Sequence, residues 1–468
     1  MLVRYTTLTV AAVVTGGCTL GPDYERPELA TPESYIQPVQ EGVSIANAPW
    51  WELFEDPVLN ELVETALVEN QDLGIAVARI QEFRAILGVT RSSQFPTVDI
   101  AARGGRTDPS QNTVNGQLTD GFADSYQLSG DVFFELDLFG RLRRSTEAAR
   151  AELLAVEENR RNVTISLIAS VASTYMLLRD LDAQLEISTR TEAARADSLR
   201  IIEARFEKGT APRLDVDQAE IELAIASASV AATERLVAQT ENSLSVLIGR
   251  NPGAIIRGLS LERQTVPPSI PAGLPSELLQ RRPDVLASEA SLAAQTARIG
   301  IAEAARWPSI SLTGSLGFES TDLSTLTDSE SGFWNFGGNI LQPLFNAGRN
   351  RSQVEAEVAR TEQALLSYEQ IVLRAFAEVE DALVAVRTYR IEYDARTRQV
   401  NAARNASILS RARYNGGVTS YLEVLDIERS LFSAELSQSQ TRRLYITSII
   451  DLYKALGGGW VPEEPESG

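Results

Sequence analysis

The longest uninterrupted helical pattern in the chain runs from Arg141 to Lys208. These 68 residues (208 − 141 + 1) contain no Gly and no Pro, and they are rich in Ala, Leu, Arg and Glu, which favour helices. At 1.5 Å per residue, the stretch predicts one helix about 100 Å long. Its many charged residues exclude a membrane span. A helix of this length is stable only when neighbours pack along it, so the chain must form an extended helical wall.

A second stretch of this kind, Arg349 to Asn415, reveals an internal duplication. At an offset of 208 residues (349 − 141), matched positions continue without a gap from each long helix into the helix that follows. Upstream the offset becomes 212, because the first copy has a longer loop. Each copy predicts the order helix, strand, loop, strand, long helix, turn, helix. The matched pairs include Gly140 and Gly348, Arg205 and Arg413, Gly209 and Gly417, and Gly249 and Gly457.

Segments that alternate apolar and polar residues precede both long helices and predict strands over about 95–105, 125–138, 307–318 and 333–345. The pattern fits a membrane β-barrel with apolar residues toward lipid, and it fits a half-buried soluble sheet as well. Four strands cannot close a barrel, and lipid does not tolerate open strand edges. A barrel would therefore need several copies of the chain. The clearest alternation sets Leu128, Val132, Phe134 and Leu136 against Gln127, Ser129, Asp131, Glu135 and Asp137.

The N-terminus has the features of an exported lipoprotein. Arg4 and the short apolar run that follows it predict a signal peptide over residues 1–17. Small residues then lead to Cys18 in a sequence that resembles a bacterial lipoprotein cleavage site. This resemblance implies a lipid such as palmitate on Cys18, and Thr19 after it implies delivery to the outer membrane. The alternative is a plain signal peptide followed by an incidental cysteine. The Pro-rich residues 18–57 predict an extended segment.

Composition limits the chemistry available to the chain. The net charge of −20 leaves no basic surface for nucleic acid. The chain has no His and one Cys, which excludes Ser-His-Asp and Cys-His catalysis, His-based zinc sites and internal disulfides. We therefore expect no enzyme activity, no metal site and no cofactor apart from the lipid on Cys18.

Five motifs follow one another on the duplicated frame. They are Arg281-Arg282-Pro283-Asp284-Val285, Ala302-Glu303-Ala304-Ala305-Arg306-Trp307-Pro308-Ser309-Ile310, Pro343-Leu344-Phe345-Asn346-Ala347-Gly348-Arg349, Arg413-Tyr414-Asn415-Gly416-Gly417 and Leu422-Glu423-Val424-Leu425-Asp426. In this order and spacing they resemble the TolC-like outer membrane factors, specifically the lipoprotein branch that serves drug-efflux pumps. The resemblance extends from Cys18 to about Leu456.

This resemblance implies an α+β membrane protein of the TolC-like channel fold. In it, a homotrimer shares a twelve-stranded outer-membrane barrel, four strands from each chain. Very long, coiled-coil-like helices form an α-barrel across the periplasm. The implied partners are a periplasmic adaptor (membrane fusion) protein, an inner-membrane pump of the RND type and outer-membrane lipid.

The turns after the two long helices predict the periplasmic end of this channel. The first contains Gly209 and Thr210, and the second contains Gly416 and Gly417. Glycine suits the positive φ that tight turns between helices require. The resemblance implies that these tips contact the adaptor and that the tunnel closes beside them.

The resemblance also implies gate residues at this end. Asp426 and Glu423 match acidic constriction rings, Asp215 matches an acidic gate residue, and Tyr414 matches its hydrogen-bonding aromatic partner. Thr419 replaces an Arg that locks the gate in some members. Three copies of each carboxylate would repel one another, which raises their pKa and attracts cations. The alternative is that these carboxylates are solvated groups near helix N-termini, where negative charge is favoured.

We predict a passive export duct for drugs or other small molecules. A secretion duct of the same fold and a pore-free, lipid-anchored periplasmic coiled-coil scaffold are the alternatives. The expected organisation is a signal peptide (1–17), a lipidated extended segment (18–57), a first repeat (58–250), an equatorial linker (251–283), a second repeat (284–458) and a mobile tail (459–468).

Overall fold

A computed structural model describes residues 19–37, 49–108, 110, 112, 122–267 and 275–458. The expected signal peptide, Cys18 and the tail 459–468 lie outside these residues. The chain divides into two compact units, each built from segments of both repeats. The first comprises Met1–Glu28, Arg79–Val156 and Ala287–Tyr368, and the second comprises Leu29–Ala78, Glu157–Leu286 and Glu369–Gly468.

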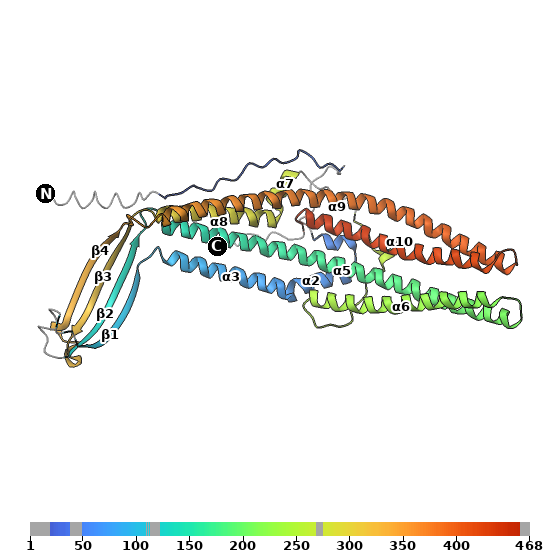
Figure 1. The fold of residues 1–468 in the computed structure, drawn as a ribbon, viewed down its shortest axis with the longest axis horizontal. Helices are drawn as coiled ribbons and strands as arrows, with labels where there is room; N and C mark the ends of the chain where they lie inside the picture. Colours follow the sequence, from blue (N-terminus) through green and yellow to red (C-terminus); the bar gives the residue numbers. More distant parts are fainter. Residues whose placement is uncertain are drawn as a thin grey trace. The chain divides into compact units, whose positions relative to one another are not determined.

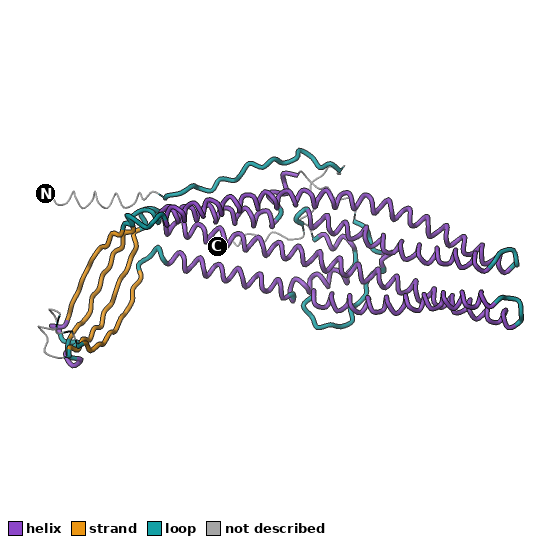
Figure 2. Tube along the Cα trace, viewed as in Figure 1, coloured by secondary structure: helices purple, strands orange, loops and turns teal. Residues whose placement is uncertain are grey.

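Helices dominate the described chain, and four strands form its one described sheet (Figures 1 and 2). In chain order the elements are η1 (Trp50–Phe54), α2 (Pro57–Glu69), α3 (Gln71–Ser92), β1 (Thr97–Thr107), β2 (Ala123–Leu136), α5 (Arg141–Glu207), α6 (Arg213–Leu247), η2 (Leu261–Arg263), α7 (Pro275–Arg281), α8 (Pro283–Ala304), β3 (Ser309–Ser320), η3 (Leu323–Thr325), η4 (Ser329–Ser331), β4 (Gly332–Leu341), α9 (Arg349–Asn415) and α10 (Tyr421–Ala455).

The two copies of the duplicated sequence form matching elements. Both α5 and α9 contain 67 residues, and both α6 and α10 contain 35 residues. Both α3 and α8 contain 22 residues. The glycines that end matched elements adopt left-handed φ values in pairs, such as 77° at Gly249 and 73° at Gly457. Among the described residues, no helix combines the length and the apolar character of a membrane span.

The sheet is antiparallel in the order β1-β2-β3-β4. Its register groups side chains by polarity, since neighbours across the strands lie on the same face. Asp131 of β2 lies opposite Asp99 and Ser315, whereas Leu128 of the same strand lies opposite Phe318. One face is therefore polar and acidic and the other is apolar.

Some boundaries differ from the sequence-based expectation. The strand expected over 333–345 ends at Leu341, because Pro343 has no amide hydrogen to donate to a ladder. The segment expected to be extended over 18–57 contains the helical turn η1, and the linker 251–283 contains η2 and α7. Pro275 begins α7 and Pro283 begins α8, because proline fits the first turn of a helix. These prolines start helices instead of interrupting structure.

The core of the second unit anchors the segment that contains the Trp pair. Trp50 is buried and stacks on Tyr453 of α10 with a centroid distance of 5.2 Å. Asp56 is also buried; it caps α2 by accepting from the amide of Val58 at 3.0 Å, and it accepts from the hydroxyl of Tyr175 at 2.9 Å. The end of the extended segment is thereby joined to α5 and α10.

In the first unit, the described chain begins with a bound segment, Thr19–Pro27, which we call the N-terminal strap. The amide of Leu20 donates to the carbonyl of Phe139 at 3.2 Å, directly before α5. The guanidinium of Arg144 donates to the Leu20 carbonyl at 3.1 Å and to the Asp23 carboxylate at 2.7 Å. Arg26 pairs with Glu289 of α8 through its Nε at 2.7 Å. The strap is thus fixed at both ends to helices.

Candidate functional site

The turn between α5 and α6 satisfies its backbone groups by a Schellman motif. Gly209 has φ 72°, and its amide donates to the carbonyl of Phe206 at 2.8 Å. The amide of Thr210 donates to the carbonyl of Arg205 at 2.9 Å, and its hydroxyl donates to the same carbonyl at 2.9 Å. These bonds reverse the chain within five residues, as a glycine at the left-handed position allows.

The turn between α9 and α10 repeats this geometry. Gly417 also has φ 72°, and its amide donates to the carbonyl of Tyr414 at 3.0 Å. The amide of Val418 donates to the carbonyl of Arg413 at 3.0 Å. Gly416 precedes the left-handed residue and continues the helical path, since its amide donates to Ala412. Only the second of the two glycines therefore needs the special backbone conformation.

A small apolar cluster joins the two hairpins near their tips, which lie at the same end of the second unit (Figure 1). Tyr421 at the start of α10 is buried, and its ring lies 5.5 Å from the ring of Tyr414. Burial raises the pKa of Tyr421 to about 12, so its hydroxyl stays neutral. The buried members of the cluster are Ile202, Val216, Ala219, Tyr421, Val424 and Leu425.

The predicted partners Asp215 and Tyr414 are not joined by a hydrogen bond among the described residues. The ring of Tyr414 instead packs under the guanidinium of Arg205, 4.9 Å from the centroid. The same guanidinium donates to Asn415 at 3.4 Å, which links the two hairpins. Asp215 lies in the first turn of α6 and is half-buried, and burial raises the pKa of its carboxyl.

The predicted constriction residues Glu423 and Asp426 lie three positions apart on α10, so they share one face of the helix. Glu423 accepts a hydrogen bond from the hydroxyl of Thr419 and lies 3.8 Å from the Nε of Arg413. Asp426 is exposed to solvent. Within one chain, Glu423 is partly neutralised by its own hairpin, and Asp426 carries the more accessible charge.

Two further residues of the tips, Arg205 and Arg413, are not indicated as gate residues by the sequence motifs. They occupy matched positions in the last turns of α5 and α9. Each contacts a predicted gate residue, Arg205 through the Tyr414 ring and Arg413 through Glu423. The signal that could have identified them is the duplication, because both copies have an Arg four residues before the left-handed glycine of the tip turn (209 − 205 and 417 − 413).

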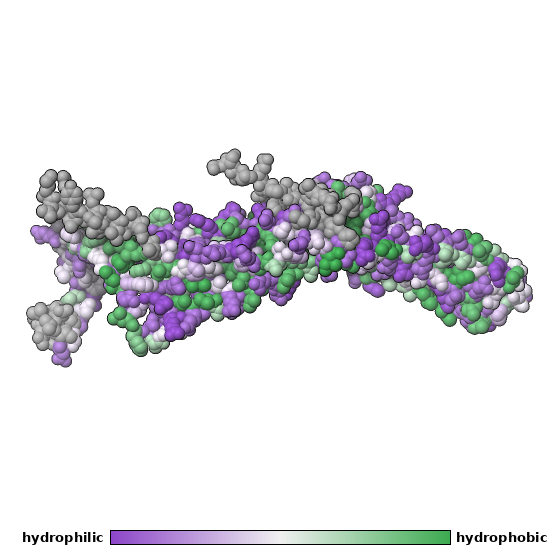
Figure 3. Space-filling model, turned by 90° about the horizontal axis from the view of Figure 1, so that it is seen from above, coloured by the Kyte–Doolittle hydropathy of each residue, from purple (hydrophilic) through white to green (hydrophobic). Residues whose placement is uncertain are grey.

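The tips also expose apolar side chains, and Figure 3 shows hydrophobic patches among polar surface at that end of the helices. Leu214, Val418 and Leu422 are all more than half exposed. Exposed apolar side chains that are surrounded by polar residues are typical of surfaces that contact another protein.

Comparisons with known proteins identify the family. The family model described as "Outer membrane efflux protein" matches residues 62–250 and 274–458. The chain is 38% identical over 459 residues to the solvent efflux pump outer membrane protein SrpC of Pseudomonas putida, covering 96% of this chain and 97% of that protein. It is 34% identical over 456 residues to the cation efflux system protein CusC of Escherichia coli, covering 96% and 97%.

The fold agrees with this assignment. The solved structure of the outer-membrane channel OprN superposes with a TM-score of 0.86 at 32% identity, covering 95% of this chain and 100% of that one. Members of the family are channels and therefore transporters rather than enzymes. The chain thus belongs to the outer membrane efflux protein family, the TolC-like channels, and is the outer-membrane channel component of a tripartite efflux system.

Proposed function

We propose that the chain acts as one subunit of a homotrimeric, passive duct. In this duct, small molecules pass from a periplasmic adaptor and an RND-type inner-membrane pump to the exterior. The observation that supports assembly from several copies of the chain is the structure of the sheet. Its apolar face is open to solvent in a single chain: the side chains between 67% and 85% exposed include Val98, Ile100, Leu316, Trp334, Phe336 and Ile340.

The edges of the sheet support closure by further copies. In the described chain β1 pairs only with β2, and β4 pairs only with β3. Backbone groups in the hydrocarbon region must be paired, so both edges need partners. Three four-stranded sheets would form a closed barrel of twelve strands with room for an aqueous lumen. The polar face that contains Asp99 and Asp131 would then line the lumen.

We propose a lipid anchor on Cys18. The strap supports this assignment because it places Thr19 against Gly140, the residue that precedes α5, where a Cβ on the glycine would meet the Thr19 side chain. The described residue that follows Cys18 in the sequence is thus held beside the start of α5. Intact mass spectrometry of the membrane-extracted protein tests this. A mass for residues 18–468 without acyl groups would contradict it.

The helix tips are the proposed gate. Asp426 and Glu423 would form carboxylate rings, with Asp215 and Tyr414 beside them, and the tip turns with Gly209, Thr210, Gly416 and Gly417 would meet the adaptor. Solvent and cation pumps are both named among the relatives, which supports a duct with little selection of its own. The inner-membrane pump would then select the exported compounds and supply the energy for their transport.

Native mass spectrometry and planar-bilayer recording test the duct. We expect a complex of three chains that conducts ions and prefers cations, because acidic residues lie on the polar sheet face and at the tips. A monomer without conductance would favour the pore-free scaffold, and a trimer selective for anions would contradict the acidic rings. Drug susceptibility of a deletion strain distinguishes efflux from protein secretion.

A further inference from the structure

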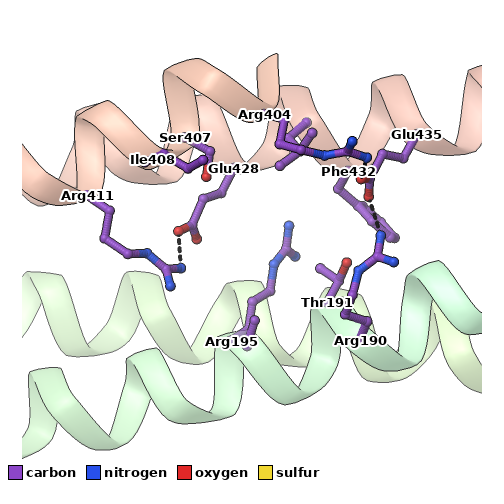
Figure 4. Close-up of a pocket in the computed structure, with 12 residues that line it drawn as sticks. Arg190, Thr191, Arg195, Arg404, Ser407, Ile408, Arg411, Glu428, Phe432 and Glu435 are labelled. Atoms are coloured by element: carbon purple, nitrogen blue, oxygen red, sulfur yellow. Dashed lines mark hydrogen bonds and ion pairs between the residues drawn. The ribbon is translucent and has the colours of Figure 1, made fainter. Parts of the chain in front are cut away.

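A cleft in the second unit is lined by several arginines that take no part in the proposed gate at the helix tips. It lies between α5 and the α9–α10 pair and has a volume of about 310 Å³ (Figure 4). Arginines from two different helices point into it, Arg190 and Arg195 from α5 and Arg404 and Arg411 from α9. The remaining lining residues are Thr191, Ala194, Ser407, Ile408, Glu428, Leu431, Phe432 and Glu435.

The arginines outnumber their acidic partners. Arg190 and Arg404 share the single carboxylate of Glu435, at 2.6 Å and 3.0 Å. Arg411 pairs with Glu428. Four arginines against two glutamates leave an excess of two positive charges in the lining, although the chain as a whole carries −20.

The fourth arginine does not reduce this excess. Arg195 is buried and lies 2.8 Å from a carboxylate oxygen of Glu222 on α6. Glu222 also pairs with Arg429 at 2.5 Å. Adding the negative charge of Glu222 and the positive charge of Arg429 to the count leaves the excess at two positive charges. The surplus therefore belongs to the cleft, and Arg190 and Arg404, whose side chains are each 56% exposed, can offer it to a ligand.

Apart from the hydroxyl groups of Thr191 and Ser407, the rest of the lining is apolar. The ring of Phe432 lies under the Arg195 guanidinium at 5.4 Å, and Ala194, Ile408 and Leu431 complete this side. The volume is in the range that accepts a small organic molecule, larger than an inorganic ion needs. An apolar side beside guanidinium groups suits a ligand that has both a compact apolar body and an acidic group.

We propose that this cleft binds a small organic carboxylate with an apolar body. Its carboxylate accepts hydrogen bonds from Arg190 and Arg404, and its body rests against Ile408, Leu431 and Phe432. The two guanidinium groups come from different hairpins. A bound ligand therefore links α5 to α9 and stabilises the two helix pairs against separation.

Calorimetric titration of the full-length protein in a neutral detergent tests the proposal, with sodium benzoate as the probe. Benzamide, a neutral molecule of the same shape, and sodium sulfate, an anion without an apolar body, are the matched ligands. We expect saturable benzoate binding in the millimolar range, at least tenfold tighter than either comparison ligand. Equal binding of benzamide or of sulfate would overturn the proposed ligand class.

Three variants separate binding from a purely structural role of the ion pairs. The double variant Arg190→Gln/Arg404→Gln should weaken benzoate at least tenfold. Glu435→Gln frees both arginines and should tighten it several-fold. Arg200→Gln is the control, since Arg200 is an exposed residue of α5 paired with Asp197 outside the cleft. Weaker binding in Glu435→Gln, or unchanged binding in the double variant, would show that the arginines only join helices.

Discussion

Gly209 and Gly417, 208 residues apart (417 − 209), have the same left-handed φ of 72° and end equivalent helices with the same pair of backbone hydrogen bonds. At neither position does a more distant part of the chain come within 4 Å of where a Cβ would lie. The requirement for glycine at both tips therefore comes from the local backbone conformation and not from packing against neighbouring elements.

Gly417→Ala should destabilise the α9–α10 turn by about 1–2 kcal/mol, the cost of left-handed backbone for a residue with a Cβ. Gly416→Ala is the control, because Gly416 does not have a positive φ. Hydrogen exchange at the start of α10 measures the difference. Equal exchange in both variants would contradict the conformational account.

Arg144 should hold the N-terminal strap in place. Its side chain is 3% exposed and contacts the strap at the Leu20 and Gly21 carbonyls and the Asp23 carboxylate. In Arg144→Gln we expect the Leu20 amide to exchange at least about tenfold faster, since its bond to Phe139 opens when the strap detaches. Arg143→Gln, at a neighbour that pairs with Asp137, should leave this amide protected.

Gly300→Ala should also displace the strap, without any change in charge. A Cβ at Gly300 would lie 2.6 Å from the Leu20 carbonyl oxygen, closer than such atoms approach. Limited chymotryptic cleavage after Tyr24, which lies within the strap, should accelerate in this variant. Gly88→Ala is the control in the other copy, because nothing lies within 4 Å of its Cβ position. Accelerated cleavage in both variants would point to a general loss of stability.

Ile100→Arg should impair insertion, because this side chain belongs to the apolar, exposed face of the sheet. An Arg on a lipid-facing position of a barrel costs about 2–4 kcal/mol near the bilayer centre. Ala101→Arg, one residue along on the polar face, should assemble normally. The yield of the native oligomer in membrane extracts compares the two, and similar losses would reverse the assignment of the faces.

Asp426→Ala should raise single-channel conductance, because replacing the exposed carboxylate side chain by a methyl group in each of three chains would widen the proposed constriction. Asp426→Glu keeps the charge and should retain the native current in planar bilayers. An unchanged current in Asp426→Ala would remove this residue from the gate.

Asp215 should make tip stability depend on pH. Burial raises the pKa of its carboxyl, so folding disfavours the charged form. The penalty is absent below the unfolded pKa, about 3.8, and grows as the pH rises through the folded value. Asp215→Asn should therefore slow hydrogen exchange at the start of α6 at pH 7, by an amount that corresponds to less than about 1 kcal/mol in the free energy of local opening. At pH 3 the same substitution should have no effect. Asp217→Asn, which loses an ion pair to Arg213, should give no stabilisation.

Much of the fold could be predicted from short stretches of the sequence. The absence of Gly and Pro predicted α5 to within one residue and both bounds of α9, and the repeated spacing predicted that the two copies form the same elements. The family was also recognisable from ordered motifs, and the comparisons confirm it. These features depend on backbone preference and on residue order, which a linear pattern contains.

The contacts of the candidate site could not be read in this way. The sequence matched Tyr414 to Asp215, but the packing of the hairpins places its ring beneath Arg205. It likewise gave no sign that Arg190 and Arg404, on separate hairpins, would share Glu435.

The sequence alone therefore determined the lengths of the long helices, the duplication and the glycine turns, because each follows from short-range conformational energies. Only the tertiary structure decided which faces of the sheet are apolar across all four strands, which charges pair and where positive charge remains uncompensated. Those outcomes depend on strand register and on helix packing between segments far apart in the sequence, such as Arg190 and Glu435, which are 245 residues apart.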